Sequence, residues 1–171
     1  ICACLVGSEM CIRDRIKNDA EVIKKELVEW RHYLHAHPEL SFKEERTTHY
    51  IVNKLKNFGY TDIQIGFGPL KTGVMVEIGS GRPCVMLRAD IDALPIQEQT
   101  GVEFCSQSKG VSHACGHDAH ITNLLGVAKL LKKYENSIKG RVKLLFQPAE
   151  ETRVKICLLY TSPSPRDMRR S

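Results

Sequence analysis

Stretches with helical periodicity alternate along the chain with stretches that have strand periodicity, and this alternation restricts the fold to layers of helices on a sheet. Apolar residues recur at helical spacing in three stretches, 18–36, 44–58 and 118–133. Strand-like stretches lie between and after them, at 63–65, 74–78, 84–87 and 142–146. We therefore predict an α/β fold, a layered mixed sheet with helices on both faces.

Local signals refine this prediction. The run Cys84–Leu87 is apolar throughout, which is typical of a strand buried on both faces. The turn residues at 79–83 predict that this strand forms a hairpin with the preceding one. Asn18 or Asp19 is predicted to cap the first helix, and Asp118 is predicted to cap the third.

The two ends of the chain lack these periods. We expect residues 1–15 to be a non-native leader and residues 152–171 to be a non-native tail, so that the folded part spans 16–151. The net charge is +5, but the folded part carries 18 Lys and Arg against 17 Asp and Glu. A nucleic-acid-binding domain gathers positive charge on a folded face. We therefore expect no nucleic-acid partner.

Cysteine usage and hydropathy point to a compartment. Three of the seven cysteines lie in the folded part, at Cys84, Cys105 and Cys115, and they are too few and too scattered for a disulfide framework. No apolar run approaches the roughly 20 residues that a membrane span needs. We expect a cytoplasmic protein without a membrane partner.

The strongest chemical signal is the run 113–118, His-Ala-Cys-Gly-His-Asp. Cys115 and His117 are two residues apart, and in an extended loop that spacing projects both side chains to the same side. A thiolate and an imidazole are good ligands for Zn²⁺ and related metals. The alternative is a buried cysteine and a loop histidine without a metal. His120, one helical turn after His117, is expected on the helix surface or beside a ligand.

Two adjacent carboxylates, Glu150 and Glu151, follow the last predicted strand. Metal-assisted hydrolysis needs one carboxylate to hold the ion and another to take a proton from the attacking water. The alternative is a pair of solvated surface glutamates.

A third set of residues, Asp90 and Asp92, follows the strand at 84–87. These carboxylates can orient a ligand histidine through its second nitrogen, or they can cap amides of their own loop. In open α/β sheets, ligands bind beyond the carboxyl ends of strands. The three sets of residues together therefore predict a hydrolytic metal site.

Four motifs, taken in order, resemble the M20 metallopeptidase family and within it the amidohydrolase branch. The branch includes hippurate hydrolases, N-acyl-amino-acid amidohydrolases and auxin-conjugate hydrolases. The first motif is Arg31-x-x-Leu34-His35-x-His37-Pro38-Glu39-Leu40, and the others span 87–95, 113–120 and 146–151. The resemblance covers about residues 16–151, as in the N-terminal part of an incomplete zinc-exopeptidase-like catalytic domain.

The resemblance implies roles for the site residues. It implies that Cys115, His117 and Glu151 bind metal and that Glu150 is the general base. It also implies two divalent metal ions, Zn, Mn, Co or Ni, and hydrolysis of the amide bond of N-acyl amino acids. In related branches a metal-binding histidine stands where this chain has Asp90. Asp90 and Asp92 are therefore expected to support ligands.

The chain also departs from the family pattern. Thr152 and Arg153 stand where the family has glycines, and two further histidine ligands and a lid domain that mediates dimerisation are expected beyond this sequence. We therefore expect the 171-residue chain alone to be inactive. Three other hypotheses stay open: a cysteine hydrolase with Cys115 as nucleophile, a non-catalytic metal-binding or interaction module, and an M20 aminoacyl-peptidase or dipeptidase.

Overall fold

A computed structural model describes residues 2–67 and 70–152 of the chain. The expected tail therefore lies almost wholly outside the described residues. The helices are α1 (Cys2–Ala36), α2 (Glu45–Phe58) and α3 (His117–Lys133), with a short 3-10 turn η1 (Glu135–Ser137). The strands are β1 (Ile63–Phe67), β2 (Leu70–Ser80), β3 (Cys84–Asp90) and β4 (Gly140–Gln147). The predicted mixture of helices and strands is confirmed.

The four strands form one mixed sheet in the order β1-β2-β4-β3. Strand β2 is antiparallel to β1 and to β4, whereas β3 is parallel to β4. The mixed sheet was predicted correctly, but the predicted hairpin between β2 and β3 is wrong, because β4 lies between them. The residues at 79–83 therefore bridge the width of a strand, and the main-chain N–H of Arg141 donates to the Pro83 carbonyl at 2.8 Å.

Strand β3 is an edge strand among the described residues. The side chains of Val85, Met86 and Leu87 are 50%, 39% and 37% exposed. The predicted burial of this strand on both faces is therefore wrong for the described part of the chain. The apolar run therefore lies in a strand that pairs with β4 on one side and has no described strand on the other.

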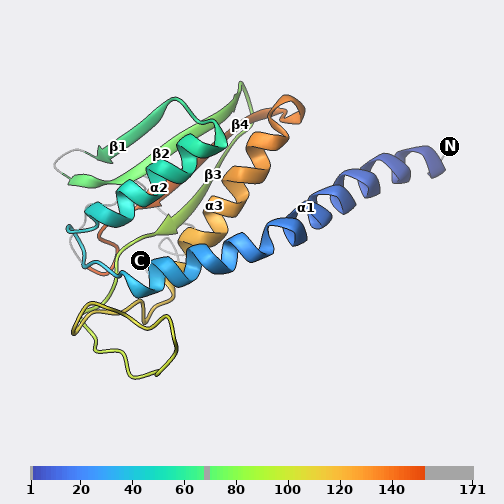
Figure 1. The fold of residues 1–171 in the computed structure, drawn as a ribbon. Helices are drawn as coiled ribbons and strands as arrows, with labels where there is room; N and C mark the ends of the chain where they lie inside the picture. The colour runs from blue at the N-terminus through green and yellow to red at the C-terminus, as the bar shows by residue number, and fades with distance from the viewer. Residues whose placement is uncertain (1, 68–69, 153–171) are drawn as a thin grey trace, which may run out of the picture.

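Helices α2 and α3 pack on each other and on one face of the sheet (Figure 1). The core between them is closed by large apolar side chains, including Trp30, Leu34, Ile51, Leu55, Val74, Val76, Ile121, Leu125, Leu144 and Phe146. Within residues 2–67 and 70–152, the helices thus lie on one face rather than on both. The predicted end of α2 is confirmed, because Gly59 adopts the left-handed conformation at φ 96°.

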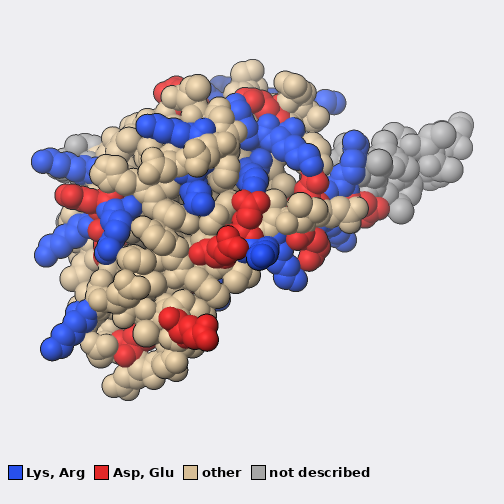
Figure 2. Space-filling model, viewed as in Figure 1, with Lys and Arg blue, Asp and Glu red and all other residues tan. Residues whose placement is uncertain are grey.

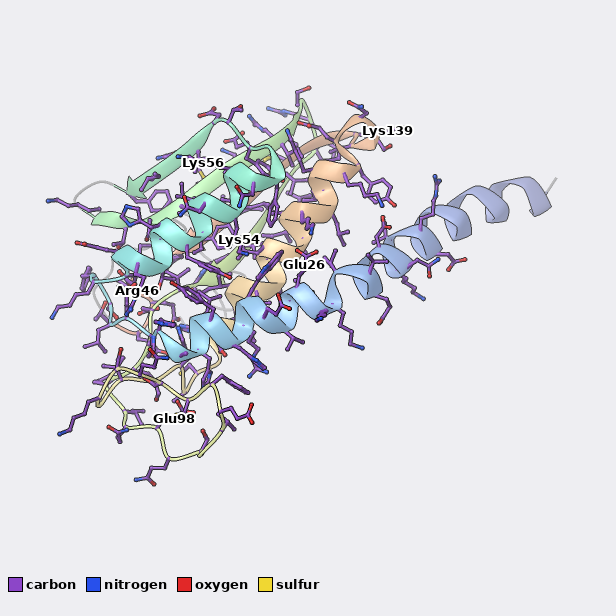
Figure 3. All side chains as sticks on the ribbon, in the orientation of Figure 1. Glu26, Arg46, Lys54, Lys56, Glu98 and Lys139 are labelled. Atoms are coloured by element: carbon purple, nitrogen blue, oxygen red, sulfur yellow. The ribbon has the colours of Figure 1, made fainter. Side chains whose placement is uncertain are left out.

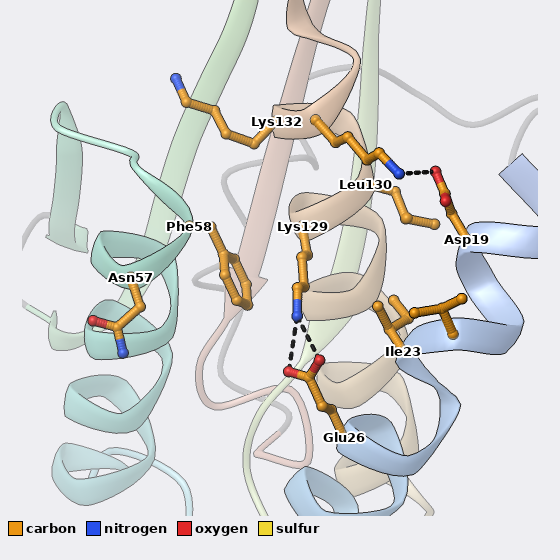
Figure 4. A pocket seen from close by; sticks show the side chains of 10 residues that line it. Asp19, Ile23, Glu26, Asn57, Phe58, Lys129, Leu130 and Lys132 are labelled. Atoms are coloured by element: carbon orange, nitrogen blue, oxygen red, sulfur yellow. Dashed lines mark hydrogen bonds and ion pairs between the residues drawn. The ribbon is translucent and has the colours of Figure 1, made fainter. Parts of the chain in front are cut away.

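Helix α1 lies across α3 and projects beyond it at its N-terminal end (Figure 1). Its predicted start at Asn18 or Asp19 is wrong, because one helix runs from Cys2 to Ala36. Asp19 does not cap a helix; its carboxylate binds Lys133 and Tyr134 of the α3 end, each at 2.6 Å. Glu26 and Lys129 form a second link at 2.6 Å, and both ion pairs line a groove between the helices (Figure 4). From residue 14 onward, where side-chain burial is described, the first buried α1 residue is Ile23.

Acidic and basic side chains are interspersed on the face of the molecule that Figure 2 shows. None of the described helices is long and apolar enough to cross a membrane.

Candidate metal centre

Two segments that carry acidic residues leave the sheet at the same edge. Strands β3 and β4 are parallel and in register to their ends, where Asp90 pairs with Gln147. The main-chain N–H of Ile91 continues the ladder by donating to the Gln147 carbonyl at 3.0 Å. The residues after each strand therefore begin side by side, as expected for parallel strands.

His117 lies at the first position of α3 and faces this edge. The residue before the helix is Gly116, with φ 82°, so the predicted cap at Asp118 is wrong. The ring of His117 is fixed by Asp92: its Nδ1 lies 2.8 Å from the main-chain oxygen and 3.4 Å from the Oδ1 atom of that residue. Burial opposes a positive charge on His117, but the bonds to Asp92 outweigh it and raise the pKa to about 9.

The other ring nitrogen of His117 faces the paired glutamates. Its Nε2 atom lies 3.8 Å from Oε1 of Glu151 and 4.0 Å from Oε2 of Glu150. One potential ligand atom from each of these three residues lies within 4.8 Å of the others. Since Nδ1 is held by Asp92, Nε2 is the nitrogen that is available to a metal.

Asp92 is fully buried and joins the two loops of the site. Its Oδ2 atom accepts hydrogen bonds from the Glu151 main-chain N–H at 2.8 Å and from the Ser41 hydroxyl at 2.7 Å. Burial tends to raise the pKa of Asp92, but the bonds from His117, Glu151 and Ser41 outweigh it and lower the pKa. This carboxylate therefore fixes both the imidazole and the glutamate that face each other.

Cys115 lies next to Glu151 at the exposed rim of the site. Its thiol forms no disulfide. The interaction with the Glu151 carboxylate, partial burial and the other nearby carboxylates raise the pKa of the thiol. The structure thus brings His117, Glu150 and Glu151 together and sets Cys115 beside Glu151.

Asp90 takes a different place from Asp92. Its carboxylate is paired with Arg88, whose Nη2 lies 2.6 Å away. One ligand atom each from Asp90, His117 and His120 also lies within 4.8 Å of the others. His117 is common to both clusters, and the Asp90 carboxylate is engaged by Arg88. The cluster with Glu150 and Glu151 therefore has the freer set of ligands. The ring of His120 lies 5.5 Å from that of His117, on the exposed side of α3.

Several residues that support the site were not assigned to it in the sequence analysis. The Asp118 carboxylate, after His117, accepts hydrogen bonds from Arg31 at 3.2 Å and from His35 at 2.9 Å. Both donors lie in the first motif on α1, whose role the sequence left open. The imidazole of His113 is 4% exposed and neither nitrogen has a partner among the described residues. Burial lowers its pKa to about 4, so it is a neutral ring beneath the site.

The cluster fits a divalent metal ion on the chemistry of its donors. An imidazole nitrogen, a carboxylate and a neighbouring thiol form a mixed N, O and S set, which suits Zn²⁺ and similar ions. The second nitrogen of the imidazole is already held, as in metal sites whose ligands are oriented by further residues. The Oδ1 atom of Asp92 is buried and has no close hydrogen bond. It lies 3.4 Å from the Nδ1 atom of His117.

Known proteins are similar to this chain. A family model described as peptidase family M20/M25/M40 matches residues 86–156. An N-acyl-L-amino acid amidohydrolase from Geobacillus stearothermophilus is 44% identical over 141 residues, which cover 81% of this chain and 37% of the relative. An N-acetyl-L-cysteine deacetylase from Bacillus subtilis is 52% identical over 131 residues, which cover 75% of this chain and 31% of the relative.

A solved structure shares both fold and sequence. It is a dinuclear metal-binding peptidase of the M20 family from Bacillus subtilis, with a TM-score of 0.68 and 45% identity, and the match covers 77% of this chain and 36% of that one. The chain thus spans about a third of the length of the proteins that it matches.

Two parallel strands end side by side, and an imidazole and paired carboxylates lie beyond their ends. Together with these similarities, this arrangement defines a domain of the metal-dependent hydrolase class. The chain resembles the M20 peptidase family and, within that family, the amidohydrolase branch, over about a third of the length of those relatives. The resemblance that the four motifs indicated is confirmed.

Proposed function

We propose that the whole protein hydrolyses the amide bond of N-acyl amino acids with two divalent metal ions. The proposal is supported above all by His117, whose Nε2 atom faces Glu150 and Glu151 while Asp92 holds its other nitrogen. The substrate class comes from the amidohydrolase and deacetylase names of the relatives. Because the chain spans about a third of those relatives, the proposal concerns the protein as a whole.

The proposed metal ligands are Cys115, His117 and Glu151, with further ligands from the rest of the protein. When bound, a divalent ion there supplies Lewis-acid chemistry, which polarises the amide carbonyl and lowers the pKa of water. Asp92 fixes the His117 ring and the Glu151 main chain. These two ligands therefore need little rearrangement to hold an ion.

Glu150 is the proposed general base. Its side chain is 39% exposed, and among the described residues the guanidinium of Arg88 lies 3.9 Å from its carboxylate. A carboxylate in this position can take a proton from the attacking water through an Oε atom and pass it to the nitrogen of the leaving amine. Glu151, whose main chain is held by Asp92, has less freedom and suits a ligand better.

A cysteine hydrolase is less well supported by the same geometry. A nucleophilic thiol needs a base that lowers its pKa, but the Glu151 carboxylate beside Cys115 raises the pKa of this thiol. The Nδ1 atom of His117 is also engaged by Asp92. A chelator separates the two mechanisms, because it inactivates a metal-dependent enzyme and spares a cysteine enzyme.

The deciding experiment compares Glu150→Gln and Glu151→Gln in the whole protein. N-acyl amino acids, dipeptides and aminoacyl peptides are offered as substrates, and metal content is measured by mass spectrometry. We expect Glu150→Gln to remove turnover and keep the metal, and Glu151→Gln to lose both. A metal-replete wild type without turnover on any of these substrates would favour a non-catalytic metal-binding module, whereas a preference for peptides would indicate a peptidase.

For the 171-residue chain alone, we propose metal binding without turnover. Its described candidate cluster offers too few ligands for two ions, and a misplaced catalytic group costs about 100-fold in rate. Chelator-sensitive hydrolysis by this chain at an ordinary enzymatic rate would contradict that expectation.

A further inference from the structure

Glu44 is a fully buried carboxylate that takes no part in the proposed chemistry. It is 0% exposed and lies at the residue before α2, next to the exposed Glu45. A buried carboxylate is costly unless its oxygens accept hydrogen bonds. Burial raises the pKa of Glu44, and the hydrogen bonds that it accepts oppose this rise. Its contacts therefore indicate why the chain keeps an acid here.

Both oxygens of Glu44 accept a hydrogen bond. Oε2 accepts from the Thr72 hydroxyl on β2 at 2.8 Å. Oε1 accepts from the main-chain N–H of Ala149 at 2.9 Å. Ala149 is the residue immediately before the paired glutamates, so Glu44 ties the start of α2 and strand β2 to the turn that carries them.

The turn that Glu44 holds is in an uncommon conformation. Ala149 has φ 56°, in the left-handed region, which costs a residue with a Cβ about 1 kcal/mol or more. Such a conformation persists where the surroundings fix it. The carbonyl of Ala149 also accepts a hydrogen bond from the Thr152 hydroxyl at 3.0 Å, so both main-chain groups of this residue are bonded.

The same turn packs closely on β2. Gly73, on β2, lies so near Pro148 that a Cβ there would be 2.6 Å from the proline Cδ. The N–H of Gly73 in turn donates to the Thr48 hydroxyl of α2 at 3.1 Å. The turn therefore rests on β2 and α2, with the Glu44 carboxylate as its polar anchor.

We infer that Glu44 is a positioning residue, which sets the direction of Glu150 and Glu151 by holding the Ala149 main chain. It acts through this turn and does not touch the metal or the substrate. The inference rests on the proposed function, because it takes Glu151 as a metal ligand.

Variants of Glu44 distinguish the effect of its side-chain length from the effect of its charge. Glu44→Asp keeps the charge but is one methylene shorter, so it cannot reach the Ala149 N–H and the Thr72 hydroxyl together. Glu44→Gln has the right length: its Oε1 accepts from Ala149, and its amide donates to the Thr72 oxygen, since a hydroxyl can also accept. The neighbouring Glu45→Gln is the matched control, because Glu45 is exposed.

The readout is Co²⁺ affinity of the 171-residue chain, followed by the absorption of the cobalt–thiolate bond to Cys115. Residues that support metal ligands contribute about 10- to 100-fold to affinity. We expect a loss of that size for Glu44→Asp, near-wild-type affinity for Glu44→Gln, and no change for Glu45→Gln. Far-UV circular dichroism and urea midpoints identify variants that have lost their fold.

A double-mutant cycle distinguishes positioning from general stabilisation. In a Glu151→Ala background, Glu44→Asp should weaken Co²⁺ binding no further, because the group that it positions is gone. An equal loss in both backgrounds, or an affinity unchanged by Glu44→Asp, overturns the inference.

Failure of the proposed function looks different from failure of this inference. The metal site itself is refuted if the wild type does not bind Co²⁺, or if it binds Co²⁺ in a way that Cys115→Ser leaves unchanged. Hydrogen exchange of the Ala149 amide then decides on Glu44. Faster exchange in Glu44→Asp than in Glu45→Gln supports the tether, and equal exchange excludes it.

Discussion

His35 on α1 contacts Glu98 across 63 residues of sequence, with its Nε2 atom 3.1 Å from Oε1 of the glutamate. Glu98 lies in the loop below the C-terminal end of α1 (Figure 3). The other ring nitrogen of His35 lies 2.9 Å from the Asp118 carboxylate. One imidazole therefore links α1, the loop that leads to Cys115, and the first turn of α3.

Replacing His35 should destabilise the chain. Burial opposes a charge on His35, but the bonds to Glu98 and Asp118 outweigh it and raise its pKa. Since His35→Ala leaves two largely buried carboxylates with fewer donors, we expect unfolding to cost about 2 kcal/mol less. Urea unfolding measures the difference. The control is His49→Ala, an exposed α2 histidine with one bond, to the Glu45 carbonyl. Equal losses in the two variants would contradict a special role for His35.

The contribution of Glu98 to stability should depend on pH in the acid range. Burial tends to raise the pKa of Glu98, but bonds from Thr100, the Ser106 N–H and His35 lower it to about 2, against 4.5 for the free side chain. The folded value is the lower one, so the contribution is complete above pH 4.5 and is lost as the pH falls towards 2. The difference in unfolding free energy between wild type and Glu98→Gln should shrink over that window.

Thermal or urea unfolding between about pH 2.5 and 6 measures this difference, with Glu103→Gln, at an exposed position of the same loop, as the control for a lost loop charge. A difference for Glu98→Gln that stays constant down to the acid limit would show that its bonds do not favour the ionised form.

Removing the Asp92 carboxylate should change the titration of His117. The side-chain oxygens of Asp92 lie 3.4 Å from the imidazole Nδ1 and 2.8 Å from the Glu151 N–H. In Asp92→Ala, NMR should place the His117 pKa below the value of about 9, nearer that of a free histidine. Co²⁺ affinity should fall by about 10- to 100-fold.

Asp62→Ala, at an exposed position before β1, is the control for loss of an acid. If His117 in Asp92→Ala still titrates near pH 9, the Asp92 carboxylate does not account for the raised pKa.

Gly140 should tolerate alanine poorly. It has φ 101°, and a Cβ there would lie 2.5 Å from the Pro83 carbonyl oxygen, where β4 begins beside the connection between β2 and β3. Gly81 has a similar φ of 81° with nothing within 4 Å of its Cβ position, so Gly81→Ala reports the conformational cost alone. We expect Gly81→Ala to cost about 1 kcal/mol and Gly140→Ala at least about 2 kcal/mol in urea unfolding. Equal costs would mean that the main chain near Pro83 shifts freely.

The sequence predicted where the helices and strands lie along the chain better than it predicted which of them pair in space. Periodicity located α2, the body of α3 and all four strands, because burial on one face leaves a repeat in the sequence. The pairing of β4 with both β2 and β3 leaves no such repeat, and the Gly79–Pro83 turn suggested a hairpin instead. The long start of α1 was missed for a related reason, since a projecting helix needs no apolar face.

The residues facing the site were predictable from motifs, but those that hold them were not. His117, Glu150 and Glu151 stand out because of their chemistry and their places beyond strands and before a helix. Glu44 and Glu45 are adjacent, identical residues at a helix start, and only the three-dimensional structure distinguishes the buried from the exposed one. The roles assigned to Cys115, His117, Glu150 and Glu151 stay predictions until metal binding is measured.

The position of β4 has a consequence for how the chain is made. The last of the four strands to leave a ribosome occupies an inner place in the sheet, between β2 and β3. Until residue 147 has been synthesised, β3 has no described partner, and β2 pairs only with β1. Because these pairings join distant parts of the sequence, the sheet should assemble slowly and late. The unpaired strands, with the apolar run of β3 among them, are then open to contact with a chaperone.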